Sequence, residues 1–297
     1  MTDFITSLLK ALAWSATFAA MFAGALRLGP GCLRQVHERA GLFLRTMLGV
    51  WILVPVFTIA MVLAFGVRGP SATMLLLMAV CPGLPTLVAN AKSARASATT
   101  ALLALLLTAA TEPLLIPYWT RILSTFHYLD LRVRAWHVID VLLPTVFLPI
   151  VTGFVLRRLW PRRAPVLARL GDVVYWTGLT VGAIVAFFQG WPLLRHVPAR
   201  AYVAALIITV GDALIGFWVA RPDPEDQKAV ALATALGNPA LALAVVEANY
   251  PEHTASALVA AYLMIRGAAI TPFEWWLARW RGGKSARRFV RRQERHA

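Results

Sequence analysis

Nine stretches that are long and apolar enough to cross a bilayer restrict the fold of this 297-residue chain more than any other feature. A bilayer core is about 30 Å thick, so a helix needs roughly 20 apolar residues to cross it. Inside lipid every backbone polar group must be bonded within the protein, which helices achieve. We therefore expect an all-α membrane protein with about nine transmembrane helices, over residues 5–26, 46–67, 71–91, 97–119, 139–156, 172–191, 200–220, 228–250 and 254–277.

The composition excludes an ordinary soluble domain. Hydrophobic residues make up 59% of the chain and charged residues 14%, whereas about a quarter of a soluble protein is charged. The first stretch has neither a basic start nor a small-residue cleavage site, so we expect a span and not a leader peptide. The two cysteines, Cys32 and Cys81, are too few for a disulfide framework or a zinc site.

The net charge of +15 raises the question of a nucleic-acid partner. With the C-terminus inside, 21 of the 29 Lys and Arg residues fall on the inner side, seven outside and one, Arg266, within a span. Inner loops of membrane proteins carry such an excess. The charge therefore predicts a multi-pass protein of the plasma (inner) membrane, with the N-terminus outside and the C-terminus cytoplasmic.

The basic cytoplasmic tail, residues 279–297, allows two interpretations. It is either a nucleic-acid-binding arm or a segment that lies on anionic lipid headgroups. Three tryptophans at the membrane boundary, Trp275, Trp276 and Trp280, favour the second interpretation. We therefore expect membrane lipid as a partner and no nucleic acid.

Two of the predicted spans are interrupted near their middle. The third is broken at 82–85 by Pro82, Gly83 and Pro85, and the eighth at 237–239 by Gly237 and Pro239. Proline removes a backbone donor, and glycine makes unwinding easier. Unwound backbone at membrane depth is tolerated only where it lines a cavity or packs in protein.

The two breaks occupy similar places in the two halves of the chain, and one full span follows each. Broken helices at corresponding positions indicate a transporter built from inverted repeats, with the substrate site where the breaks meet. The alternative is that both are ordinary proline kinks.

The residues around the breaks resemble the bile acid:sodium symporter family. The first match runs from Cys81-Pro82-Gly83 through Lys92 and Arg95 to the segment 111–117, which reads TEPLLIP. The second comprises 226–233, then Gly237-Asn238, then 241–244. The span order is similar too, apart from one N-terminal helix found in ten-helix members.

The resemblance implies two domains and two crossed discontinuous helices. The core domain would comprise residues 71–119 and 200–277, including both breaks. The panel domain, against which the core rocks, would comprise residues 1–67 and 139–191.

The chain departs from the family pattern at the sodium ligands. Where sodium-coupled members carry oxygen-bearing side chains, this chain has Leu87, Val88, Ala101, Leu105, Ala233 and Gly237, and it keeps only Asn238. Sodium is a hard cation that needs several oxygen ligands. We therefore expect the fold without sodium coupling, and neither a metal nor a cofactor.

Ionisable residues at membrane depth are costly and are candidates for function. Arg266 would bind an anionic substrate through its guanidinium, or would form a structural ion pair with Glu112 or Asp212. Either carboxyl could carry a proton, with Asp212 the stronger candidate and Glu112 alternatively a helix-end residue near the interface. Glu247 lies less deep.

These residues lead to a hypothesis about function. The chain would be a secondary transporter of a small or amphipathic organic anion, proton-coupled or a uniporter, with Arg266, Asn238, Thr86 and Asn90 at the substrate. The alternatives are a membrane sensor that binds without transport and an intramembrane enzyme. Against an enzyme, the sequence contains neither H-E-x-x-H nor G-x-S-x-G.

Overall fold

The structure, a computed structural model, describes residues 2–27, 32–83, 87–125, 140, 143–194, 197–238, 241–242, 266 and 270–280. These residues contain helices and no strand. The elements are α1 (Thr2–Leu26), α2 (Cys32–Glu38), α3 (Ala40–Leu48), the π-helix η1 (Gly49–Leu53), α4 (Val54–Ala64), α5 (Gly69–Val80), α6 (Leu87–Ser93), α7 (Ala98–Leu123), the π-helix η2 (Leu143–Phe147), α9 (Leu148–Leu159), α10 (Ala164–Leu194), α11 (Ala199–Val219) and α12 (Pro224–Ala235). Residues 270–279 are also helical.

The helices and their exposed side chains are those of a membrane protein. Three helices in the described part of the chain, Ala40–Ala64, Ala98–Leu123 and Ala199–Val219, are long and apolar enough to cross a bilayer. Large apolar side chains point outward from several helices, including Leu114, 76% exposed, and Phe188, 73% exposed. Exposed apolar side chains of this kind are compatible with the hydrocarbon core of a bilayer. Most of the ninth expected span and the second half of the eighth lie outside the described residues.

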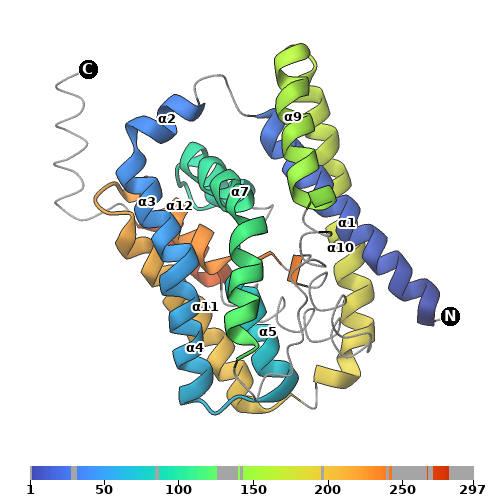
Figure 1. Cartoon of the computed structure of the whole chain (residues 1–297), viewed down its shortest axis with the longest axis vertical. Coiled ribbons are helices and arrows are strands. Elements are labelled where there is room, and N and C mark those ends of the chain that lie inside the picture. The colour runs from blue at the N-terminus through green and yellow to red at the C-terminus, as the bar shows by residue number, and fades with distance from the viewer. Residues whose placement is uncertain are drawn as a thin grey trace.

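The helices form two groups that lie side by side (Figure 1). In the first group α1 packs against α9 and α10 through small residues. A Cβ atom added to Gly171 would lie 2.9 Å from the carbonyl oxygen of Ala19 and 2.9 Å from Cβ of Ala23. One added to Gly153 would lie 2.8 Å from Cβ of Ala25. Small residues let membrane helices approach closely and gain van der Waals contact.

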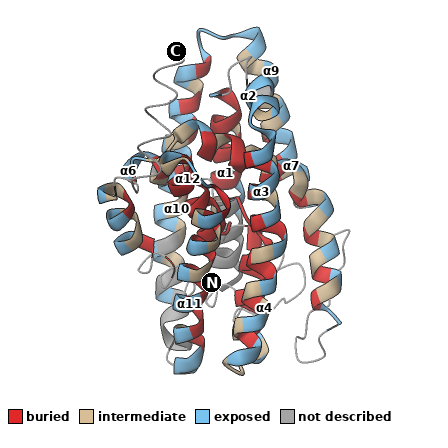
Figure 2. Cartoon of the chain, turned by 90° about the vertical axis from the view of Figure 1, so that its left-hand side faces the viewer, coloured by how far each residue is buried: buried red, intermediate tan, exposed pale blue. Residues whose placement is uncertain are grey.

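The second group contains α3, η1, α4, α5, α6, α7, α11 and α12. Figure 2 shows buried residues where these helices meet and exposed residues on their outer faces. The backbones of α11 and α12 come close at Gly216, whose added Cβ would lie 2.5 Å from the carbonyl oxygen of Val230. The side chains of Leu77, Leu105 and Leu232 fill the space between the helices.

The second expected span packs differently from the prediction, which placed it in the panel with α1. Residues 40–64 pack mainly on α5, α7 and α11 of the second group. Two tryptophans account for part of this attachment to α7. The indole of Trp51 donates to Oγ1 of Thr111 at 3.0 Å, and the indole of Trp119 donates to the carbonyl oxygen of Trp51 at 2.9 Å. Among the described residues, residues 40–64 therefore pack with the second group and not with α1.

Candidate functional site

Two interrupted helices meet in the second group. The first, α5, ends at Val80, and the chain continues through Cys81, Pro82 and Gly83 before α6 begins. The second, α12, ends at Ala235, and residues 236–238 are not helical. The backbone amide of Asn238 donates to the carbonyl oxygen of Cys81 at 2.7 Å. The two breaks thus contact each other directly, while Pro85 and Pro239 lie outside the described residues.

Gly237 lies at the closest approach of the two breaks. A Cβ atom at this position would lie 2.5 Å from the carbonyl oxygen of Met78 and 2.7 Å from Nη1 of Arg266. It would also lie 3.1 Å from the carbonyl oxygen of Cys81. Only glycine leaves room here for both the crossing backbone and the guanidinium group.

Asn238 caps the helix that resumes after the second break. Its Oδ1 accepts a hydrogen bond from the amide of Leu241 at 3.2 Å, and its carbonyl oxygen accepts one from Ala242 at 3.0 Å. This is the ordinary N-cap role of asparagine. The side chain is buried, and its Nδ2 has no hydrogen-bond partner within the described chain. Oδ1 of the amide therefore caps the helix, while its Nδ2 is a donor without a partner that the structure describes.

Arg266 pairs with Asp212, one of the two carboxylates considered from the sequence. Its Nη2 lies 3.2 Å from Oδ2 of Asp212, and both side chains are buried. The backbone of Asp212 is fixed as well, because Oγ1 of Thr234 donates to its carbonyl oxygen at 2.7 Å. The ion pair therefore joins Arg266 to α11, and Thr234 joins α12 to the same turn.

Glu112 faces the first break. Helix α7 continues past Glu112 to Leu123 despite Pro113 and Pro117, so the interpretation of Glu112 as a helix-end residue is wrong. The side chain is buried, and its Oε1 would lie 2.6 Å from a Cβ added to Gly83, which has a φ of +81°. Neither carboxylate oxygen has a hydrogen-bond partner among the described residues.

Three further residues of the sequence hypothesis divide into one that the structure describes and two that it does not. Asn90 lies on α6 and is half-buried. Thr86 and Glu247 lie outside the described residues.

The positions that resemble sodium-ligand positions are filled by apolar side chains. Leu87, Ala101, Leu105 and Ala233 are all buried, and Cδ1 of Leu105 would lie 3.7 Å from a Cβ added to Gly83. Where the structure describes the chain, no group of three His, Cys, Asp or Glu side chains is placed to hold a metal ion. Among the described residues, the side-chain oxygens next to Gly83 are those of Glu112 and Thr108.

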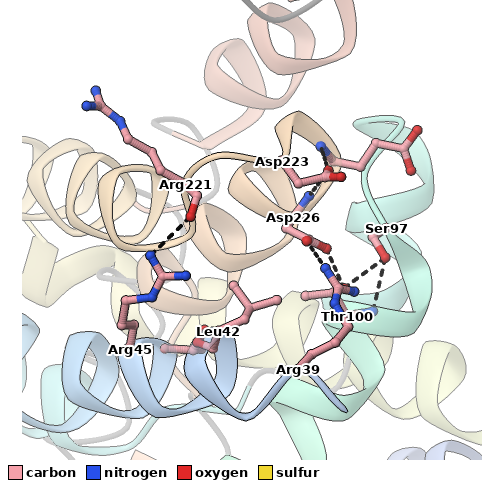
Figure 3. Close-up of polar contacts among 10 residues, drawn as sticks. Arg39, Leu42, Arg45, Ser97, Thr100, Arg221, Asp223 and Asp226 are labelled. Atoms are coloured by element: carbon pink, nitrogen blue, oxygen red, sulfur yellow. Dashed lines mark hydrogen bonds and ion pairs between the residues drawn. The ribbon is translucent and has the colours of Figure 1, made fainter. Parts of the chain in front are cut away.

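A second polar cluster joins the ends of α3, α7 and α12 (Figure 3). Oγ1 of Thr100 donates to Oδ1 of Asp226 at 2.6 Å, and Arg39 forms an ion pair with Oδ2. Ser97 caps α7 by accepting from the amide of Thr100 at 3.2 Å. Burial raises the pKa of Asp226, while the hydrogen bond from Thr100 and the charge of Arg39 oppose the shift.

Sequence reasoning did not single out this cluster as a site. The available signals were the cap residues: Ser97 precedes α7, and Asp223 precedes Pro224 at the start of α12. Oδ1 of Asp223 accepts from the amides of Glu225 and Asp226 at 2.8 Å and 3.2 Å. Such residues predict where helices begin but not which side chains meet between them.

The sequence itself supports the resemblance. It matches the Sodium Bile acid symporter family over residues 16–208, from α1 into α11, and the match includes the first break. No curated protein matches the chain. Because the family match covers more than half of the sequence, the chain belongs to the sodium bile acid symporter family, which is a family of membrane transporters.

Proposed function

We propose that this protein is a secondary transporter that moves a small or amphipathic organic anion by alternating access, without sodium coupling. The observation that carries the proposal is the contact of the two breaks through Asn238 and Cys81, with a buried Arg266 beside it. Broken helices at membrane depth line substrate sites in transporters, because their unwound backbone supplies polar groups there.

The site suits an anion. Arg266 is a buried cation next to Gly237, and a guanidinium binds a carboxylate or sulfonate through two parallel hydrogen bonds. Nδ2 of Asn238 adds a donor at the same break. Asp212 serves as the counter-ion of Arg266 while no substrate is bound. Substrate binding then exchanges one anionic partner of Arg266 for another.

A proton suits the first break better than sodium does. The buried side chains of Leu87, Ala101 and Leu105 offer no ligand for a hard cation. Glu112 offers a single carboxyl with both oxygens without a partner in the described chain. A buried carboxylate without a partner is very costly, and binding a proton removes that cost. We therefore assign the proton to Glu112 and the counter-ion role to Asp212, which reverses the preference drawn from sequence.

The moving parts would be the two groups of helices. The group of α1, α9 and α10 is joined within itself by close small-residue contacts, and the breaks lie in the other group. Rocking of one group against the other would expose the crossing to each side of the membrane in turn. We place the C-terminal side in the cytoplasm of a plasma (inner) membrane, on the distribution of basic residues.

Uptake of a labelled bile acid by proteoliposomes under imposed gradients tests the proposal. We expect an inward proton gradient to stimulate uptake and a sodium gradient to have no effect. Glu112→Gln should reduce proton-driven uptake at least about tenfold, as expected for loss of a functional intramembrane carboxyl. Exchange of labelled for unlabelled substrate at equal pH should survive, because it needs no net proton movement.

Glu225→Gln is the matched control, because Glu225 is an exposed carboxylate in the first turn of α12. It should leave proton-driven uptake unchanged. Stimulation by sodium would overturn the coupling assignment. Ligand binding without flux under any gradient would overturn transport and favour a sensor.

A further inference from the structure

A basic pocket lies where the two groups of helices face each other at one end. Its volume is about 440 Å³, and the ends of α1 and α9, the start of α10 and the helix α6 form its walls. Four cationic side chains and one carboxylate line it, namely Arg27, Lys92, Arg157, Arg169 and Asp172.

The charges in this pocket do not balance. Asp172 pairs with Arg27, which also donates to the carbonyl oxygen of Ala168 at 3.5 Å. Within the described residues, Arg157 donates to the carbonyl oxygen of Pro161 alone, at 3.4 Å. In the part of the chain that the structure describes, Lys92, Arg157 and Arg169 form no ion pair. Three like charges around one space repel one another, and an anion in that space would remove the repulsion.

We propose that this pocket is a binding site for a phosphate-bearing anion, separate from the crossing of the broken helices. Arg157 and Arg169 offer planar guanidinium donors, which match phosphate oxygens, and Lys92 offers a compact charge from another helix. Leu26 and Pro165 add an apolar wall beside these charges. Basic pockets between transmembrane helices at the cytoplasmic side are suited to the headgroups of anionic lipids.

The position of the pocket gives the ligand a mechanical role. Lys92 belongs to α6, which follows the first break, whereas Arg157 and Arg169 belong to α9 and α10. A phosphate held by all three would join the two groups of helices at this end. Its occupancy would favour the arrangement in which the groups stay close here.

Thermal unfolding of the full-length protein in neutral detergent tests the site and identifies the source of the phosphate. The probes are phosphatidylglycerol, phosphatidylcholine and soluble glycerol 3-phosphate. A ligand that binds the folded state raises the apparent unfolding temperature by mass action. We expect stabilisation by phosphatidylglycerol and none by phosphatidylcholine.

A pair of neighbouring arginines supplies the matched control. Arg157 lines the pocket and Arg158 does not. Arg157→Gln removes a charge-assisted hydrogen bond to the phosphate, so it should raise the lipid concentration needed for half the shift at least about tenfold. Arg158→Gln should leave it unchanged. Arg169→Gln and Arg162→Gln form a second pair of the same design. Arg169 lies within α10 and lines the pocket, whereas Arg162 lies just before α10 and does not.

Each outcome bears on the proposal. The same shift from glycerol 3-phosphate alone would support the site and identify a soluble ester as its ligand. The absence of a shift from both phosphatidylglycerol and glycerol 3-phosphate would overturn it. Equal losses in Arg157→Gln and Arg158→Gln would also overturn it, because they would show general charge attraction to the lipid. None of these results depends on transport, so the site and the proposed function fail separately.

Discussion

Two buried aspartates, Asp212 and Asp226, differ in how many of their carboxylate oxygens have a partner. Both oxygens of Asp226 are used, one by Thr100 and the other by Arg39. Among the described residues, Oδ2 of Asp212 accepts a hydrogen bond from Arg266 at 3.2 Å, and Oδ1 has no partner. Asp226 lies at the end of a helix, whereas Asp212 lies inside α11 beside the crossing.

The environments of the partner arginines differ in the same direction. The side chain of Arg39 is 41% exposed, so water still solvates much of its charge, while that of Arg266 is 4% exposed. A fully bonded pair at the surface of the bundle has one favourable arrangement. A buried, incompletely bonded pair is costly and can be rearranged by a ligand at lower cost. We therefore propose that the cluster around Asp226 fixes packing, whereas the pair of Asp212 and Arg266 can change partners.

The largest effect on stability should come from breaking the buried pair. Asp212→Asn and Arg266→Gln should each reduce the free energy of unfolding by about 3–5 kcal/mol, because each leaves one buried charge without its partner. The double variant should lose less than the sum of the two. Titration with sodium dodecyl sulfate in mixed micelles measures all three free energies.

Additive losses in that cycle would contradict the pairing of Asp212 with Arg266. The cycle also tests Glu112 as the alternative partner. Arg266→Gln combined with Glu112→Gln should deviate less from additivity than the pair with Asp212 does, because these side chains share no hydrogen bond in the described chain.

A smaller effect should follow from breaking the cluster around Asp226, in the first turn of α12. Asp226→Asn should reduce the free energy of unfolding by about 1–3 kcal/mol, because it weakens the acceptors for Thr100 and Arg39. Uptake per folded molecule should remain at the level of the unmodified protein. Asp223→Asn is the control and should be nearly neutral, because asparagine caps a helix as well as aspartate does. Loss of specific uptake in Asp226→Asn would show that this cluster is not purely structural.

The smallest effect should distinguish two threonines on α7. Thr100 donates to Asp226, whereas the acceptors of Thr108 in the described chain are carbonyl oxygens of its own helix, those of Ala104 and Leu105. Thr100→Val should therefore cost about 1 kcal/mol and Thr108→Val less than about 0.5 kcal/mol. The same detergent titration resolves the two. Equal costs would mean that the bond between Thr100 and Asp226 contributes nothing measurable.

The sequence was sufficient for features that depend on local chemistry. Apolar stretches of membrane-spanning length predicted helical spans, and the family resemblance around Pro82 and Gly83 is confirmed by the match over residues 16–208. Proline and glycine predicted both interruptions because their effect on a helix does not depend on distant residues.

Features that depend on contacts between distant segments were not predictable in the same way. Arg266 had two candidate carboxylates at similar depth, and only the arrangement of α11 selects Asp212. The helix-end interpretation of Glu112 was wrong because packing carries α7 through two prolines. The attachment of residues 40–64 to α7 depends in part on Trp51 and Trp119, whose hydrogen bonds no local pattern predicts. Spacing alone does not specify such partners.

The packing of α1 has a consequence for side-chain entropy. Cβ atoms added to Gly171, Gly153 and Gly178 would meet alanines and backbone of α1, namely Ala16, Ala19, Ala23 and Ala25, and at Gly153 also the ring of Phe22. Glycine and alanine have no rotamers to lose when they are buried, so these contacts form without that entropic cost, whereas larger side chains of the same interface, such as Tyr175 and Leu26, still incur it. The glycine–alanine contacts also have no alternative rotamers to populate when the surroundings change. This part of the interface therefore retains one mutual fit in any conformation that preserves the backbones.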